Sequence, residues 1–230
     1  MNKDSTPFMT VKETFTTIAS DYDRMNSILS MRMHNRWNRE LADTVKGAHH
    51  LLDLCAGTGE IAFHFLKENP QSLASLLDFC PEMLAIAKDK GSCFEPRFII
   101  QEGDAQKLPF DDAVFDAATV AYGIRNVENP LLCFYEVYRV LQAGGRFAIL
   151  ELTRPSGLLL LGHRLYLRLV PLLGKLCARK EMPYSYLKDS IQKFTAPSSL
   201  MEQMREVGFV NIQSRKLLGG TATLIWADKC

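Results

Sequence analysis

The chain has 230 residues, 47% of them hydrophobic, and a formal net charge of +1 at pH 7. This length and composition suffice for one α/β domain with a full core. A charge so close to zero gives no reason to expect nucleic acid or a strongly acidic partner. The six cysteines form no C-x-x-C pair and no cluster with histidine, so we predict no metal site, and reduced thiols in a cytoplasmic protein. No segment resembles a secretory signal or reaches the roughly 18 apolar residues of a membrane span.

The N-terminal region shows two helical patterns. Apolar residues at positions 11, 15, 18, 19 and 22 have helical spacing, and a second pattern runs from about residue 30 to residue 45 and stops at Gly47. Both patterns precede the first strand pattern. We therefore expect these helices to lie over or beside the ligand-binding edge of a sheet.

Strand and helix patterns then alternate along the chain. We expect strands at 50–55, 73–78, 97–101, 114–121 and 146–151, and helices at 59–68, 81–90 and 129–142. Such alternation with short links predicts a parallel sheet with helices on both faces. Further helical patterns at about 158–180, 184–193 and 197–207 precede two strands, 210–216 and 222–228, that a glycine-containing loop joins as a hairpin. A mostly parallel sheet ending in an antiparallel hairpin is the Rossmann-like topology of class I methyltransferases.

Residues 51–60, with the sequence LLDLCAGTGE, are the most informative stretch of this pattern. A strand runs through Asp53 into a glycine-rich turn and then a helix, an arrangement that lets backbone N–H groups approach a nucleotide-like ligand. The spacing also fits a dinucleotide fingerprint, and a turn that only connects strand to helix is a further alternative. However, Asp53 and Glu60 flank the turn without a nearby Lys or Arg, which suits the ammonium and sulfonium groups of S-adenosylmethionine. The turn itself consists of Gly57, Thr58 and Gly59.

Acidic residues also follow the next two predicted strands. Asp78 ends the second strand and could accept hydrogen bonds from both ribose hydroxyls. Asp104 follows the third, where it could accept from the adenine amino group while the Ala105 N–H donates to the ring. A single strand-end acid is often only a solvated residue. Three at successive strand ends predict one cofactor site, because the carboxyl ends of parallel strands meet at the same edge of a sheet.

Four segments resemble the C-methyltransferases of menaquinone and ubiquinone biosynthesis. Residues 22–37, YDRMNSILSMRMHNRW, are similar to the N-terminal signature of that family, and 53–60 to its cofactor loop. Residues 121–127, AYGIRNV, resemble its G-[IL]-R-N-V segment, and 139–146 with Glu151 its second signature. The resemblance extends over about residues 11–228.

The chain departs from the family pattern at several positions. Gln142-Ala143, Thr153 and Cys55-Ala56 replace Lys-Pro, Ser and Ala-Gly, which are mild changes because the turn and the helix stop are kept. Ala121 stands where members often have a serine that contacts the cofactor, so we expect only a backbone contact to the cofactor there.

The resemblance implies C-methylation of a reduced polyprenyl quinone precursor with S-adenosylmethionine. Conversion of demethylmenaquinol to menaquinol and the equivalent ubiquinone step both remain open, as does the tail length. Arg125 would lower the pKa of the ring phenol, and Asn126 and Tyr22 would hydrogen-bond the ring oxygens. Alternatively, Arg125 pairs with Glu128 or Glu151, Tyr22 only packs, and His34 is a structural histidine instead of a base. Another small phenolic or lipid acceptor and a non-catalytic cofactor-binding scaffold are the alternative functions.

Residues 156–180 form a leucine-rich stretch in which Arg164, Arg168, Lys175 and Arg179 recur near one helical face. Such a helix either lies at a membrane surface or over a lipid-tail channel, or is a plain lid. We leave open a peripheral contact with the inner face of the membrane, and a homodimer. The expected single domain over 1–230 divides into a helical substrate cap, a nucleotide-binding core, a helical lid insertion and a hairpin, at 1–47, 48–152, 153–207 and 208–230.

Overall fold

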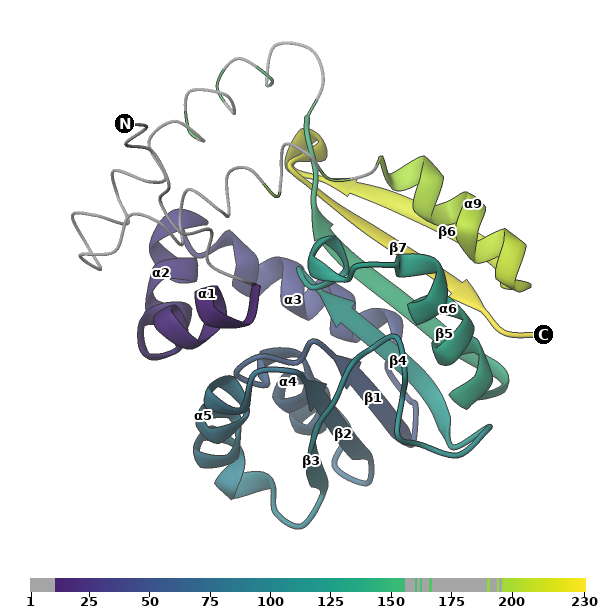
Figure 1. Ribbon diagram of the computed structural model, residues 1–230, viewed down its shortest axis with the longest axis horizontal. Helices are drawn as coiled ribbons and strands as arrows, with labels where there is room; N and C mark the ends of the chain where they lie inside the picture. The colour runs from purple at the N-terminus through teal and green to yellow at the C-terminus, as the bar shows by residue number, and fades with distance from the viewer. Residues whose placement is uncertain are drawn as a thin grey trace, which may run out of the picture.

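The computed structural model describes residues 11–155 and 196–230, together with residues 160, 162, 166, 190 and 194. At its centre lies a seven-stranded sheet of order β3-β2-β1-β4-β5-β7-β6 (Figure 1). Strands β1 to β5 are parallel, and β7 pairs antiparallel with both β5 and β6. The predicted topology, with its C-terminal antiparallel hairpin, is therefore confirmed. The strands are β1 (His50–Leu54), β2 (Leu73–Asp78), β3 (Phe98–Glu102), β4 (Phe115–Ala121), β5 (Leu141–Leu152), β6 (Val210–Leu217) and β7 (Ala222–Asp228).

Helices cover both faces of the sheet. Successive strand residues point to opposite faces, so Leu51 packs with α3, α4 and α5 on one face while Leu52 packs with α6 and α9 on the other. Each face thus has its own apolar core, and together they fix the sheet on which the site is built. The helices of the described residues are α1 (Val11–Ile18), α2 (Tyr22–Leu29), α3 (Met33–Thr44), α4 (Glu60–Glu68), α5 (Pro81–Gly91), α6 (Pro130–Val140) and α9 (Pro197–Val207).

The N-terminal region contains three α-helices where the sequence pattern indicated two. Helix α2 occupies residues 22–29, and Met31 and Arg32 then take positive φ values of 50° and 63° before α3 begins. These two residues break the helical path and let α3 turn back over the sheet. In Figure 1, α1 and α2 lie beside the upper end of the sheet, and α3 runs from them along it.

Strand β5 begins earlier than its pattern indicated. Leu141 pairs with Phe115, and pairing then resumes between Arg146 and Ala117, so residues 142–145 bulge out of the strand. Gly144, at φ 76°, supplies the backbone conformation that this bulge requires. The expected strand at 146–151 is the regular part of β5.

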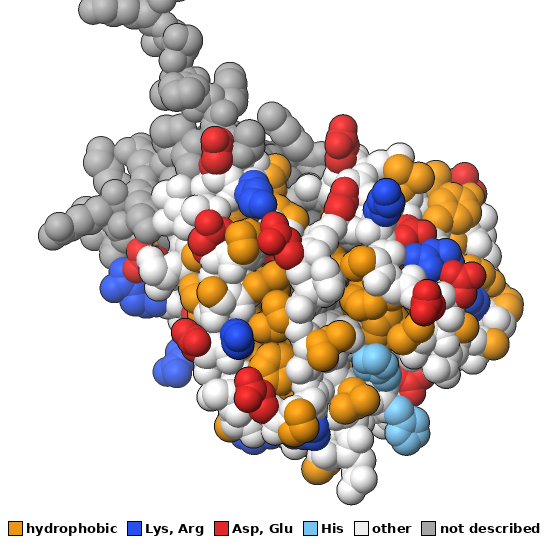
Figure 2. Space-filling view, turned by 60° about the horizontal axis from the view of Figure 1, so that its bottom comes forward, with side chains coloured by type: hydrophobic (Ala, Val, Ile, Leu, Met, Phe, Trp, Pro, Cys, Tyr) orange, Lys and Arg blue, Asp and Glu red, His pale blue; other side chains and the backbone are white. Residues whose placement is uncertain are grey.

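Two expected features fall largely outside the described residues, namely the basic leucine-rich stretch 156–180 and the helix at 184–193. The division into four segments stays a prediction. Among the helices that the structure describes, none has the length and apolar character of a membrane-spanning segment. The face shown in Figure 2 carries Lys, Arg, Asp and Glu interspersed with apolar side chains, so neither sign of charge dominates it.

Candidate active site

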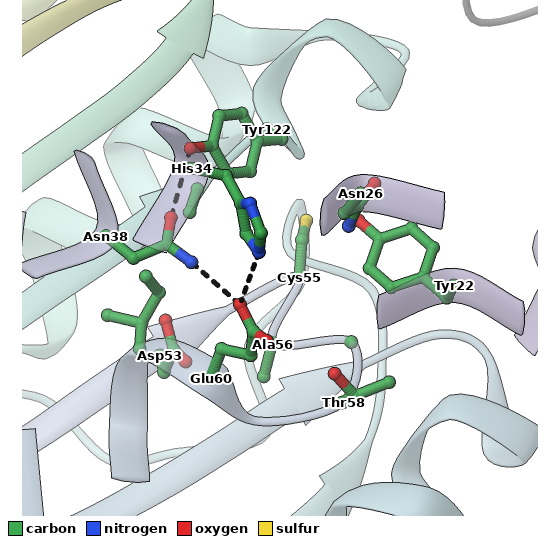
Figure 3. Close-up of a pocket in the computed structure, with 13 residues that line it drawn as sticks. Tyr22, Asn26, His34, Asn38, Asp53, Cys55, Ala56, Thr58, Glu60 and Tyr122 are labelled. Carbon is green, nitrogen blue, oxygen red and sulfur yellow. Dashed lines mark hydrogen bonds and ion pairs between the residues drawn. The ribbon is translucent and has the colours of Figure 1, made fainter. Parts of the chain in front are cut away.

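A pocket of about 410 Å³, open mouth included, lies where the strand order reverses between β1 and β4 (Figure 3). Open α/β sheets bind ligands at this reversal, outside the carboxyl ends of the strands. The pocket is lined by Tyr22, Asn26, His34 and Asn38 from α2 and α3, by Asp53, Cys55, Ala56, Gly57 and Thr58 from β1 and the turn, by Glu60 and Ile61 from α4, and by Ala121 at the end of β4 with Tyr122 directly after it.

Asp53 is the most buried acid of the pocket, with 1% of its surface exposed. Its carboxylate accepts hydrogen bonds from Thr119 Oγ1 at 2.8 Å and from the Ala62 N–H at 3.2 Å, which tie the end of β1 to β4 and α4. Burial raises the pKa of Asp53 to about 7, although both hydrogen bonds lower it. A cation in the pocket would favour the ionised form.

The two glycines of the turn have different physical reasons to be glycine. Gly57 has a φ of 54°, and a Cβ there would meet only Tyr22, at 4.0 Å, so the space above it is open to a ligand. Gly59 has a φ of 81°, and its Cβ would lie 2.4 Å from the Phe63 ring. Gly57 therefore leaves the pocket open to a ligand. At Gly59 a side chain would collide with the Phe63 ring of α4, so glycine is needed there for packing.

Asp78 sits behind the turn and does not line the pocket. One carboxylate oxygen accepts from the Gly57 N–H at 2.8 Å and the other from the Cys80 N–H at 2.9 Å. Burial raises the pKa of Asp78, and these backbone donors lower it. A carboxylate has about four acceptor sites, so Asp78 keeps capacity for ribose hydroxyls while it holds the turn in place.

Asp104 and Ala105 lie further along the same edge of the sheet. The exposed Asp104 carboxylate accepts from the Gln106 N–H at 2.9 Å, and Ala105 is buried in the core next to it. Neither lines the pocket. Ala121 does, at the end of β4, where its methyl group offers no polar contact.

A three-residue cluster connects the N-terminal helices to the turn. The Thr58 hydroxyl donates to Asp23 Oδ1 at 2.6 Å, and the Lys90 ammonium lies 2.8 Å from Asp23 Oδ2 and 3.2 Å from the Thr58 hydroxyl. We call Asp23, Thr58 and Lys90 the latch. It joins α2 to the glycine turn and to α5, so α2 is fastened beside the pocket.

Helix α3 places two further polar side chains in the pocket. His34 and Asn38 stand one helical turn apart on the same face and point towards Glu60 (Figure 3). Asn38 Nδ2 donates to Glu60 Oε2 at 2.8 Å, and the Tyr122 hydroxyl donates to Asn38 Oδ1 at 3.0 Å. Sequence reasoning gave Asn38 and Tyr122 no role. The signal for Asn38 was its i, i+4 spacing from His34 on the predicted helix, whereas Tyr122 had no such signal.

Of the three residues expected to act on an acceptor, Arg125 lies close enough to Tyr22 for its charge to act on the Tyr22 hydroxyl. Arg125 forms a buried ion pair with Glu151, one of the alternatives that the sequence left open, and the Arg125 side chain is 5% exposed. Asn126 donates to the Tyr122 carbonyl at 3.4 Å. Burial raises the pKa of Tyr22, while a hydrogen bond with Asn26 and the charge of Arg125 lower it. Of the three, only Tyr22 lines the pocket directly.

The donor and acceptor set of the pocket fits S-adenosylmethionine. Asp53 and Glu60 supply two carboxylates for a ligand with two positive groups, and none of the described residues that line the pocket is Lys or Arg. The open space over Gly57 allows the close backbone approach that a nucleoside ligand needs. His34 adds a buried Nε2 atom for which the described residues provide no hydrogen-bond partner.

A family model described as the ubiE/COQ5 methyltransferase family matches residues 2–229 of the chain. The chain belongs to this family. It is therefore a methyltransferase that uses S-adenosylmethionine, as the turn and the strand-end acids predicted. The resemblance of residues 22–37 and 121–127 to the quinone-pathway enzymes was correct as well.

A curated relative agrees with this ubiE/COQ5 membership, and solved structures share the fold. The chain is 46% identical over 229 residues to the demethylmenaquinone methyltransferase of Protochlamydia amoebophila, covering 96% of the chain and 95% of that protein. An S-adenosylmethionine-dependent methyltransferase from Thermotoga maritima superposes with a TM-score of 0.69 at 19% identity, covering 95% of this chain and 99% of that one. The [4+2]-cyclase SpnF reaches the same TM-score at 16% identity, covering 96% of each chain. The last two show the fold alone.

Proposed function

We propose that this ubiE/COQ5 family member methylates a ring carbon of a reduced polyprenyl quinone precursor, converting demethylmenaquinol to menaquinol. The observation that carries the proposal is the 46% identity, over 96% of the chain, to a protein named for demethylmenaquinone. The pocket adds support, because Tyr22 and Asn26 of the family signature line it beside the cofactor turn. Ring oxygens of a hydroquinol are suited to such hydrogen-bonding side chains.

The cofactor supplies an electrophilic methyl group on a positively charged sulfur. The chain must then position the ring and favour loss of a phenolic proton, since electron density from oxygen makes the neighbouring carbon nucleophilic. Arg125 would stabilise the developing phenolate electrostatically, although its pairing with Glu151 offsets part of its charge. Tyr22 and Asn126 would hold the ring oxygens. Much of the acceleration should come from this positioning.

In the same proposal, the cofactor lies along the edge formed by the carboxyl ends of the parallel strands. Asp53, Gly57 and the backbone of Ala121 would receive the methionine end, and Thr58 and Gly59 would shape the turn around it. Asp78 would bind the ribose hydroxyls. Asp104 and the Ala105 N–H would bind the adenine ring.

Two finer parts of the proposal concern partners. We infer that residues 156–180, most of which lie outside the described part of the chain, contact the membrane surface where a polyprenyl tail resides. Flotation with vesicles that contain anionic lipid should then recover the protein, and absence from both anionic and neutral vesicles would favour a plain lid. We also infer that the protein forms a homodimer. Sedimentation equilibrium would measure its mass in solution and so test this.

Methyl transfer from labelled cofactor tests the proposed reaction. The purified protein should label demethylmenaquinol in detergent, and should label neither oxidised demethylmenaquinone nor a simple phenol without a tail. Labelling of the phenol alone would favour the alternative acceptor, and labelling of none, with cofactor bound, would favour a scaffold. A single-turnover measurement on Arg125→Ala tests its role, because near-normal transfer would remove Arg125 from the mechanism.

A further inference from the structure

His34 has a defined proton arrangement. We assign the Ser30 hydroxyl proton to the Asn26 carbonyl, 2.6 Å away, so that the hydroxyl oxygen accepts from His34 Nδ1 at 2.7 Å and from the His34 backbone N–H at 3.3 Å. Nδ1 therefore carries the ring proton. Nε2 on the other side of the ring is left as a bare lone pair. Burial lowers the pKa of His34, which keeps the ring in this neutral form.

The lone pair on Nε2 lies at the pocket and has no hydrogen-bond partner in the part of the chain that the structure describes. The His34 side chain is 6% exposed, and Nε2 itself is buried without a donor within hydrogen-bond distance. A buried polar atom left unsatisfied costs about 1–3 kcal/mol, so such an atom in a ligand pocket indicates a donor on the ligand.

The nearest charged group, Glu60, is also an acceptor. Its Oε2 lies 3.8 Å from His34 Nε2, beyond hydrogen-bond distance, and already accepts from Asn38 Nδ2. The Asn38 amide is held in this orientation because its oxygen accepts from the Tyr122 hydroxyl. Glu60 is thus presented to the pocket as a carboxylate next to a second acceptor, with no donor between them (Figure 3).

We propose that His34 Nε2 and Glu60 bind the α-ammonium group of the methionine end of S-adenosylmethionine. An ammonium nitrogen about 2.8–2.9 Å from each atom fits between acceptors that are 3.8 Å apart. The α-carboxylate cannot take this place, since both atoms would repel it. Helix α3 of the cap thereby recognises the cofactor as well as covering the acceptor. The proposal rests on the cofactor and not on the quinone.

Equilibrium binding without any acceptor tests this assignment. S-adenosylhomocysteine carries the ammonium group, and its des-amino analogue, S-(3-carboxypropyl)-5′-thioadenosine, keeps the carboxylate and the nucleoside. The wild-type protein should prefer the first ligand, and His34→Phe should reduce this preference about 10- to 100-fold while the affinity for the des-amino analogue changes little. His34→Gln, whose amide oxygen can accept, should retain part of the preference.

His64→Phe is the matched control, because the Nε2 atom of His64 accepts from Arg39 outside the pocket, and it should keep the wild-type preference. Should His34→Phe not fold in a thermal melt, His34→Gln and Glu60→Gln carry the test, and both should reduce the preference. An equal loss of affinity for both ligands would assign His34 a structural role. Normal binding with lost methyl transfer would instead place Nε2 on the acceptor. If wild type binds neither ligand, the proposed function itself fails.

Discussion

The affinity for S-adenosylmethionine should fall as the pH drops below neutral, because Asp53 must be ionised to favour a cationic cofactor. Its pKa in the cofactor-free protein is raised by burial to about 7. Binding of a positively charged ligand selects the ionised form of Asp53, so Asp53 must release its proton. Binding therefore becomes coupled to proton release below the pKa and uncoupled above it.

The size of this effect follows from the protonated fraction. With a pKa of about 7, Asp53 is roughly nine tenths protonated at pH 6 and about one tenth at pH 8. The dissociation constant for the cofactor should therefore be about tenfold higher at pH 6 than at pH 8. Binding should release roughly 0.9 proton per cofactor at pH 6 and about 0.1 proton at pH 8. Calorimetry in two buffers of different ionisation enthalpy measures both quantities.

Asp53→Asn is the control that isolates this carboxyl from Glu60 and His34, which share the pocket and also titrate. Its cofactor affinity should be lower at pH 8, and the pH dependence that remains in this variant belongs to Glu60 and His34. The raised pKa of Asp53 also makes the stability of the folded protein depend on pH. A carboxyl whose pKa is higher in the folded than in the unfolded state stabilises the protein at low pH and loses this contribution as the pH rises through 7. Equal affinity at pH 6 and 8 without proton release in the wild type would refute the reasoning.

Three further predictions concern residues around the pocket. Arg125→Ala leaves Glu151 buried without its partner and should lower the free energy of unfolding by roughly 3–5 kcal/mol in urea titrations. Gly59→Ala combines a positive φ with a Cβ clash and should cost about 2–5 kcal/mol in the same assay. Lys90→Met opens the latch at a half-exposed ion pair, so stability should change by less than about 1 kcal/mol while stopped-flow measurements show faster cofactor dissociation.

Controls for these predictions are available in the chain. Gly47 shares a positive φ, 88°, but has nothing within 4 Å of its Cβ position, so Gly47→Ala should cost only about 1–2 kcal/mol. If both glycine variants lose the same stability, the clash at Gly59 is not the cause. A double variant of Arg125 and Glu151 should lose less than Arg125→Ala alone. Unchanged dissociation in Lys90→Met would show that the latch does not hold the cofactor.

The sequence by itself determined the fold and the cofactor. Strand and helix periods are local properties, and the turn from Asp53 to Glu60 and the acid Asp78 at the next strand end are local signals as well. Parallel strands end at one edge, so local signals of this kind sufficed to predict that these acids would share an edge. The sequence pattern placed the start of β5 wrongly, because strand pairing decides that boundary. A bulge lets β5 start at Leu141 instead of the expected residue 146.

The tertiary structure alone decided which polar groups meet. Nothing in the spacing of His34, Asn38 and Glu60 indicates contact, because it arises only when α3 turns back at Met31 and Arg32 and packs over the turn. Side-chain pairing across such a distance depends on the direction in which packed helices cross, which is set by apolar contacts elsewhere. The bare nitrogen of His34 is visible only once that packing is known.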